Sequence, residues 1–191
     1  QKPYVAGEGD SYSQDIVSRY KNGEFFSQDS IKHTGPKFHT KGGRVVYGGG
    51  GITPDIFVAE DTSAVTSYYT EAIYSGLIFT FAYNYVDDNR SNLNHFDNIE
   101  QMASYLHRQG IVEQFVRYAD ANGLKRRNLM IMRSHALLEK LLISRIVYNK
   151  MDEAALYSYN NIDDKVIAAA LKVFEDGAAF PKKPNRSLRA R

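Results

Sequence analysis

Serine, histidine and lysine residues in the second half of the chain are the first candidates for catalytic chemistry. Ser134 and His135 are adjacent. On a helix, neighbouring side chains point about 100° apart, and no carboxylate is evidently placed to orient the imidazole. Lys140 and Ser144 lie four residues apart, a spacing that many long helices offer by chance. We therefore interpret His135 as a histidine packed near an apolar stripe and assign neither pair a catalytic role.

Histidine and aspartate pairs nearer the N-terminus are equally weak candidates. His33 and His39 have no neighbouring carboxylate or histidine at helical spacing, which favours surface histidines over a metal site. Asp87 and Asp88 favour a polar helix end over an acid/base pair. The chain has no cysteine, which excludes disulfides, thiolate metal sites and a cysteine nucleophile. We therefore expect no catalytic, cofactor-binding or metal-ligating residue in this chain, and no cofactor.

A run of four glycines, residues 48–51, is the most distinctive feature of the sequence. β-Branched and aromatic residues flank it at 45–47 and 56–58, and this composition is typical of short strands. The pattern predicts a strand, a glycine-rich corner pressed against another piece of backbone, and a second strand. A phosphate-binding loop would need a lysine after the glycines and a helix behind it, and neither is present.

The region before the glycines predicts a small and incomplete sheet. A short helix is expected over residues 15–20, with Gly23 ending it. Residues 37–40 are expected to form a strand that turns through 41–43 and pairs with 44–47. Because one hairpin is marginally stable in water, further strands are expected to complete the sheet. Its unpaired edge predicts self-association of this chain.

The rest of the chain predicts helices. Residues 72–83 carry no charge, but they are fewer than the roughly 20 apolar residues of a bilayer span, so we expect a central buried helix and no transmembrane segment. Residues at helical spacing define an inward stripe on the second long helix: Ile131, Leu138, Leu142 and Ile146. A similar stripe is expected on the last helix: Ile167, Ala170, Leu171 and Phe174. The expected helices cover residues 66–86, 99–109, 111–121, 128–148 and 152–159, followed by one that Asp163 caps and Gly177 ends.

These elements predict an α+β fold, in which a small incomplete β region is followed by a mainly α-helical domain. The expected division is a β region at residues 1–60, a helical domain at 61–178 and a basic flexible tail at 179–191. Hydrophobic residues make up 43% of the chain and charged residues 24%, which is ordinary for a soluble globular protein. The net charge of +2 is too small to argue for a nucleic-acid partner.

Residues 43–56, Gly-Arg-Val-Val-Tyr-Gly-Gly-Gly-Gly-Ile-Thr-Pro-Asp-Ile, resemble the signature that follows the catalytic core in carboxyl-terminal processing peptidases, also called tail-specific proteases. In that family a Gly-Ile-x-Pro-Asp segment leads the chain out of the catalytic sheet. The opening Gln1-Lys2-Pro3-Tyr4 resembles the residues just after the family's Pro-x-Gly-Arg-x-Ile strand. Segments within 81–90, 115–119 and 144–148 are similar to members with a long C-terminal extension, so the resemblance covers residues 1–176.

The resemblance implies a parent protein that is a serine endopeptidase with a Ser/Lys dyad, in which the lysine acts as the base. A PDZ domain of such proteins helps to capture the C-terminal tail of a protein or peptide substrate. Both catalytic motifs lie upstream of Gln1, so Ser134, Ser144 and Lys140 inherit no role. The chain is then expected to be inactive by itself. The resemblance also implies a periplasmic or cell-envelope location.

Two alternatives stay open. The chain could be a non-enzymatic helical interaction or oligomerisation domain that shares the glycine motif. It could also bind nucleic acid or another anionic surface through the basic residues of 181–191. That tail has no aromatic residues for base stacking, so this alternative ranks last and no nucleic-acid partner is expected.

Overall fold

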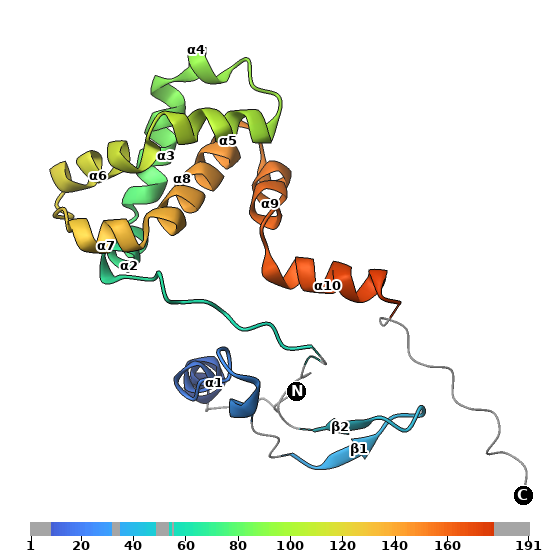
Figure 1. Cartoon of the computed structure of the whole chain (residues 1–191). Coiled ribbons are helices and arrows are strands. Elements are labelled where there is room, and N and C mark those ends of the chain that lie inside the picture. Colours follow the sequence, from blue (N-terminus) through green and yellow to red (C-terminus); the bar gives the residue numbers. More distant parts are fainter. Residues whose placement is uncertain (1–8, 32–34, 49–53, 55, 178–191) are drawn as a thin grey trace, which may run out of the picture. The chain divides into compact units, whose positions relative to one another are not determined.

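The computed structural model describes residues 9–31, 35–48, 54 and 56–177, with the backbone alone for 9–13 (Figure 1). It is mostly helical, with one small two-stranded antiparallel sheet towards the N-terminal end, which confirms the expected α+β class. The chain divides into two compact units. One unit is Thr62–Ile167, and the other consists of the parts of the chain before and after it.

The N-terminal part contains two helical segments before its sheet. Helix α1 is Gly9–Lys21, and a short 3-10 helix, η1, is Gln28–Ser30. Gly23 follows α1 with a φ of +81°, a conformation that glycine adopts without steric cost. The helix expected at residues 15–20 and its glycine stop are therefore confirmed, although the helix begins earlier than expected.

The sheet is the hairpin that the sequence predicts. Strands β1 (Lys37–His39) and β2 (Val45–Tyr47) pair antiparallel, with Phe38 opposite Val46. The Thr40 amide donates to the Arg44 carbonyl at 2.9 Å, and the Arg44 amide donates to the Thr40 hydroxyl at 3.1 Å. These bonds close the expected turn.

The second strand expected after the glycines is not formed. Residues 56–58 are described and lie outside any strand. A strand needs a hydrogen-bonded neighbour, and no described segment pairs with these residues. Gly49, Gly50 and Gly51 lie outside the described residues, so the predicted corner is seen only at Gly48.

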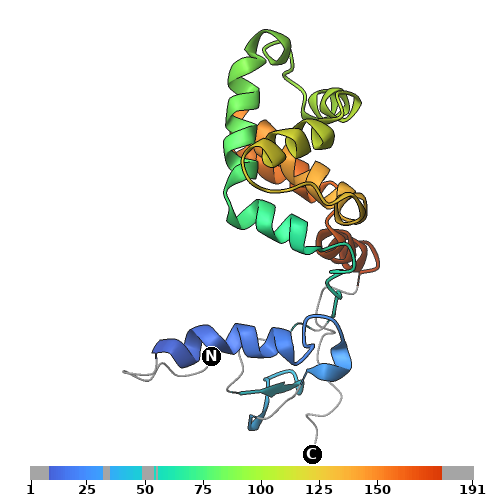
Figure 2. The same cartoon turned by 90° about the vertical axis from the view of Figure 1, so that its left-hand side faces the viewer.

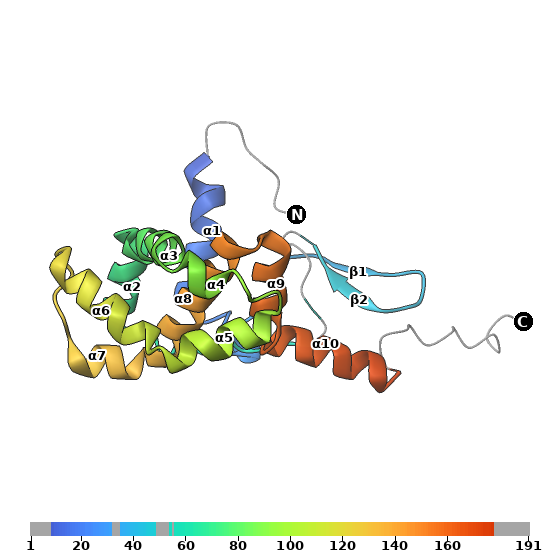
Figure 3. The same ribbon diagram turned by 90° about the horizontal axis from the view of Figure 1, so that it is seen from above.

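Eight helices lie within the Thr62–Ile167 unit, and a ninth, α10, crosses its end. Their bounds are α2 Ser67–Tyr74, α3 Leu77–Asp88, α4 Arg90–Leu93, α5 Ile99–Arg108, α6 Ile111–Ala121, α7 Asn128–Arg133, α8 His135–Lys150, α9 Glu153–Asn161 and α10 Lys165–Glu175. Helix α8 lies between α3 and α5 (Figure 3). None of the described helices is long and apolar enough to cross a membrane.

The core of this unit forms around α8. The four residues of the predicted inward stripe are all buried: Ile131 of α7 and Leu138, Leu142 and Ile146 of α8. Aromatic rings join α3 to α6, because the Phe81 ring meets the Phe115 ring edge-on with centroids 5.6 Å apart. The Tyr118 ring lies 5.5 Å from the same Phe81 ring. Such pairs add specific ring contacts to the burial of apolar area.

The first expected long helix is two helices. Gly76 separates α2 from α3 with a φ of +75° and a ψ of 0°, which ends one right-handed helix before the next begins. The Gly76 amide donates to the Ile73 carbonyl, and the Ser75 hydroxyl donates to the Ala72 carbonyl. Figure 2 shows the two helices meeting at a steep angle. The single helix predicted over residues 66–86 is therefore wrong at its middle.

The second expected long helix also breaks, at Ser134. This residue separates α7 from α8, with φ −93° and ψ 7°. Its buried hydroxyl donates to the Ala64 carbonyl at 2.7 Å and lies 2.7 Å from the Thr66 hydroxyl. Because the side chain binds the segment that enters α2, the helix break is coupled to that segment. The prediction of one helix over residues 128–148 is wrong for this reason.

Helix α10 differs from the prediction in its cap and in its environment. Asp164, and not Asp163, caps it, because an Asp164 oxygen accepts bonds from the Val166 and Ile167 amides at 2.7 and 3.0 Å. The residues expected to face inward are exposed, and they include Leu171 at 57% and Phe174 at 62%. Periodicity identifies an apolar face of a helix, but it does not show whether a neighbour covers that face.

Candidate functional site

The structure places the serine and histidine candidates in separate, structural environments. Ser134 is buried and bonded to backbone and Thr66, whereas His135 is exposed, so the packed histidine that the sequence predicts is wrong. The Ser144 hydroxyl donates to the Leu141 carbonyl of its own helix at 2.9 Å. Among the residues that the structure describes, neither serine hydroxyl contacts an imidazole or an amine.

Lys140 and Ser144 do not form a pair. The Lys140 ammonium contacts the Asp163 carboxylate and donates to the Asn160 carbonyl at 3.3 Å. These bonds connect α8 to the end of α9. A base for nucleophilic catalysis must lie within hydrogen-bond reach of its nucleophile, and this lysine is bonded elsewhere.

The remaining sequence candidates that the structure describes also lie in structural or surface positions. Asp87 is bonded to Arg90, with the Arg90 Nη2 2.6 Å from the carboxylate. His39 is exposed on β1, and His33 lies outside the described residues. No group of three or more potential ligands that could hold a metal ion occurs in the described part of the chain.

Two bidentate ion pairs hold the connection between α6 and α7. Arg127 binds Glu71 of α2 with contacts of 2.5 and 2.8 Å, and Arg126 binds Glu113 of α6 with contacts of 2.8 and 3.0 Å. The hydrogen bonds from Arg127 lower the pKa of Glu71, and those from Arg126 lower the pKa of Glu113. Because each arginine is engaged in a two-contact ion pair, this cluster stabilises the connection.

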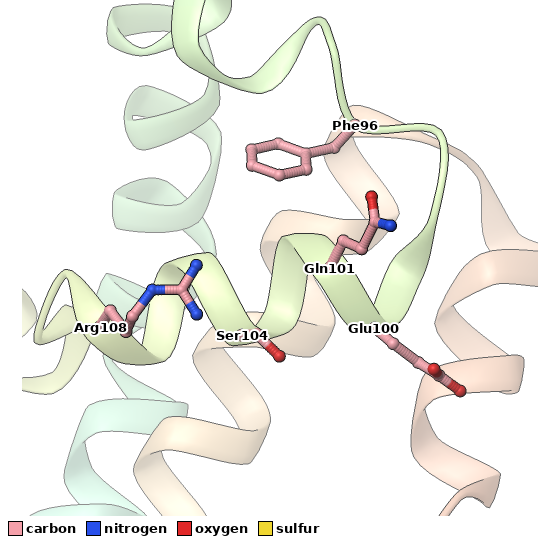
Figure 4. A pocket seen from close by; sticks show the side chains of 5 residues that line it. All are labelled: Phe96, Glu100, Gln101, Ser104 and Arg108. Carbon is pink, nitrogen blue, oxygen red and sulfur yellow. The ribbon is translucent and has the colours of Figure 1, made fainter.

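A shallow hollow of about 470 Å³ lies on the outer face of α5 (Figure 4). Phe96 from the preceding loop and four residues of α5 line it: Glu100, Gln101, Ser104 and Arg108. The Glu100 carboxylate points away from the Arg108 guanidinium. The hollow is open to solvent, and no hydrogen bond joins its Ser104 hydroxyl to its Glu100 carboxylate, so the described lining has no arrangement for nucleophilic catalysis.

A second hollow, of about 270 Å³, lies between α8 and the end of α9. Its polar lining includes Glu139, Lys140, Tyr159 and Asp163. Glu139 is bonded to His107 of α5 at 2.8 Å, and Lys140 is bonded to Asp163. Burial, with smaller contributions from the Glu139 and Asp163 carboxylates, raises the pKa of Tyr159 to about 12. These polar groups therefore hold α5, α8 and α9 together.

Aromatic side chains and one arginine gather where α3 packs against α8. Phe79 and Tyr83 of α3 are 44% and 65% exposed, and Tyr148 of α8 is 45% exposed. The Arg145 guanidinium lies over the Phe79 ring, 4.8 Å from its centroid. We call these four residues the α3–α8 surface. The uncharged sequence of residues 72–83 predicts a helix buried on most sides, and these exposed rings show that this prediction is wrong.

The glycine motif makes a close backbone contact at its one described glycine. A Cβ atom added at Gly35 would lie 1.6 Å from the Gly48 carbonyl oxygen. The Gly48 amide also donates to the Pro36 carbonyl at 2.9 Å. Gly48 therefore makes the close backbone contact that was expected for the glycine-rich corner.

Residues 68–153 match a family of unknown function, DUF8443. The matched segment extends from α2 to the first residue of α9 and therefore lies within the helical unit. No curated protein and no solved structure matches the chain.

Sequence reasoning missed the α3–α8 surface because its residues come from two helices far apart in the chain. The i,i+4 spacing of Phe79 and Tyr83, and the i,i+3 spacing of Arg145 and Tyr148, were signals for one shared face on each helix. Neither spacing indicates that the two faces adjoin. Only the packing of α3 on α8 brings them together.

Proposed function

We propose that this chain is the C-terminal part of a tail-specific serine endopeptidase, and that the parent protein's catalytic serine and lysine precede it. The observation that carries the proposal is the sequence of residues 43–56, with its Gly-Ile-x-Pro-Asp segment. In this account the parent cleaves proteins near their C-termini and has a PDZ domain. It acts in the periplasm or cell envelope. The chain supplies the border of the catalytic sheet and a helical extension.

The small size of the two-stranded sheet supports this proposal. Each strand has three residues, and Phe38 and Val45 are 54% and 43% exposed. A two-stranded sheet of this size is marginally stable by itself, so it gains most from additional strands. Residues 56–58 have strand-forming side chains but no pairing partner in the described chain. A catalytic sheet in the parent would supply such a partner.

The positions of the possible nucleophiles and bases support an inactive C-terminal part. Ser134, Ser144 and Lys140 are bonded to backbone or to a carboxylate and lie apart from one another's functional groups. An acyl-transfer mechanism needs a nucleophile, a base and an oxyanion site in mutual reach. Catalysis in the parent is therefore assigned to residues outside this chain.

Cleavage of a fluorogenic peptide tests the proposal. The chain 1–191 alone is expected to release no fluorophore, and the longer natural protein is expected to cleave. The expected activity disappears when the serine of the parent's own dyad motif is replaced by alanine. Serine-dependent cleavage by residues 1–191 alone would contradict the proposal, as would a parent sequence without the upstream serine and lysine.

A second candidate is a non-enzymatic interaction or oligomerisation role for the helical unit. The exposed rings of the α3–α8 surface favour it, because tyrosine, phenylalanine and arginine are enriched at protein interfaces. This role is compatible with a peptidase parent, and it also stands without one. Finding no upstream serine and lysine in the parent would leave it as the remaining function.

A further inference from the structure

We infer that the α3–α8 surface, formed by Phe79, Tyr83, Arg145 and Tyr148, binds an acidic segment of a polypeptide that also carries an aromatic or aliphatic side chain. The inference gives the interaction role a partner class and a binding site. It does not rest on the peptidase assignment, since binding and cleavage are measured separately.

Arg145 has no charged partner among the described residues. Among the described residues, no carboxylate lies within ion-pair distance of Arg145, and its Nε atom is buried without a hydrogen-bond partner. By contrast, Arg126 and Arg127 are each bound to a carboxylate by two contacts. A planar guanidinium with free donors matches a carboxylate in shape and charge.

The Arg145 guanidinium is already fixed in place. It lies over the Phe79 ring, so the long side chain has fewer conformations before binding and loses less conformational entropy when a partner binds. The Nε atom is inaccessible to solvent, so protein encloses that edge of the guanidinium and only the two Nη atoms are left to meet a partner's carboxylate. A preorganised group binds a ligand with a smaller entropic cost.

Exposed aromatic side chains lie on the same helix faces as Arg145 and Phe79. Tyr83 lies one helical turn from Phe79 on α3, and Tyr148 lies one turn from Arg145 on α8, so each tyrosine shares a helix face with one member of the Arg145–Phe79 contact. Tyrosine and arginine are the side chains that most often dominate the binding energy of an interface. Aromatic or aliphatic side chains of a partner would cover the rings while its carboxylate meets Arg145.

A single cation favours a polypeptide over a nucleic acid. Binding of single-stranded nucleic acid combines stacked aromatic rings with several cations that follow the phosphates. The α3–α8 surface contains one arginine, and the net charge of the chain is only +2. An acidic segment with one well-placed carboxylate is the simpler match.

Selection from a phage-displayed library of random short peptides, with the chain 1–191 immobilised, tests the inference. Enriched peptides are synthesised with a fluorescent label, and their affinity is measured by fluorescence anisotropy. We expect them to share an aspartate or glutamate beside an aromatic or aliphatic residue. Replacing that acid by its amide should weaken binding about tenfold, the range of a lost interface anchor.

Matched variants of the chain locate the binding. Arg145→Met is expected to weaken the same peptides about tenfold, and Tyr83→Ser several-fold. Arg117→Met removes an exposed arginine of α6 and is expected to leave affinity unchanged. Circular dichroism checks that each variant folds. Because Tyr83 is 65% exposed, its variant keeps the test decisive if Arg145→Met unfolds.

Three results would overturn the inference. One is a selection that enriches no acidic peptide. Another is peptide binding that neither Arg145→Met nor Tyr83→Ser weakens. The third is a labelled single-stranded oligothymidylate that binds through the same residues more tightly than any peptide.

Discussion

The Ser134 hydroxyl connects two segments of the helical unit that lie 70 residues apart in the sequence. It is buried, and it bonds the Ala64 carbonyl and the Thr66 hydroxyl. We expect Ser134→Ala to lower the free energy of unfolding by about 1–3 kcal/mol, because two partly buried polar groups lose a partner. Urea denaturation followed by circular dichroism measures this loss.

Ser144→Ala is the matched control for that experiment. Its hydroxyl bonds only the Leu141 carbonyl of its own helix, and alanine favours a helix. We expect the Ser144→Ala loss to be the smaller of the two. Equal losses for the two variants, or the reverse order, would show that the Ser134 bonds contribute little.

The Tyr68 hydroxyl differs from the Ser134 hydroxyl, because it makes no hydrogen bond with the described residues. Its side chain is completely buried, and its hydroxyl has no partner among the described residues. Burial raises the pKa of Tyr68. We expect Tyr68→Phe to change the free energy of unfolding by less than about 1 kcal/mol or to increase it, because an unpartnered hydroxyl is removed. A loss above that size, measured by urea denaturation, would indicate a partner for this hydroxyl.

The raised pKa of Tyr159 predicts how the free energy of unfolding changes at alkaline pH. Burial first, and then Glu139 and Asp163, raise its pKa to about 12 in the folded state, while the unfolded chain ionises near 10. The stability that the neutral Tyr159 side chain contributes is therefore fully present below about pH 10 and is lost as the pH rises towards about 12. We expect Tyr159→Phe to reduce this alkaline loss by about 1–2 kcal/mol. Unfolding curves across this range check it, and identical pH dependence in both proteins would contradict it.

At the scale of elements, the break between α2 and α3 depends on Gly76. Its φ of +75° is costly for a residue with a side chain, although a Cβ atom there would meet no atom within 4 Å. We expect Gly76→Ala to lower the free energy of unfolding by about 1–2 kcal/mol. Gly76→Asn should cost less, because asparagine tolerates this conformation better. Equal stability of Gly76→Ala and the unchanged protein would contradict the account of this break.

The hairpin depends on a different property of glycine, which is the absence of a side chain. A methyl group at Gly35 would collide with the Gly48 carbonyl, whereas one at Gly42 would meet only the Thr40 hydroxyl at 3.9 Å. We expect Gly35→Ala to reduce amide hydrogen-exchange protection in β2 at least about tenfold, as for a loss of 1.4 kcal/mol. Gly42→Ala is expected to leave it nearly unchanged. Equal protection in the two variants would argue against this contact.

The sequence predicted most elements but not the breaks within them. Thr66 and Asp152 signalled helix starts, and both side chains accept hydrogen bonds as N-caps. The break at Gly76 was missed because an apolar stripe continues on both sides of the glycine. The break at Ser134 was missed because bonds to Ala64 and Thr66, far away in the sequence, decide where the helix stops. The exposed apolar face of α10 was missed because periodicity does not identify a neighbour. The α3–α8 surface needed the packing of two helices, so no local pattern could indicate it.

At the scale of the whole molecule, the exposed hairpin edge predicts self-association. Val45 is 43% exposed on a strand without a further neighbour in the described sheet. We expect light scattering to give a mass above the 21.6 kDa of one chain at high concentration. Val45→Lys should lower that mass, because an edge charge opposes strand pairing between chains. A monomeric mass for the unchanged protein at all concentrations would contradict this expectation.

We propose that this chain belongs to a serine endopeptidase whose catalytic residues lie outside it. The most direct measurement is the rate of fluorogenic peptide cleavage by the full natural protein with Lys140→Met and Ser144→Ala introduced together. We expect the doubly substituted protein, checked for folding, to cleave within about twofold of the unchanged rate, because neither side chain contributes to the reaction. A full-length protein that cleaves nothing, or a folded double variant about a hundredfold slower in kcat, would contradict the claim.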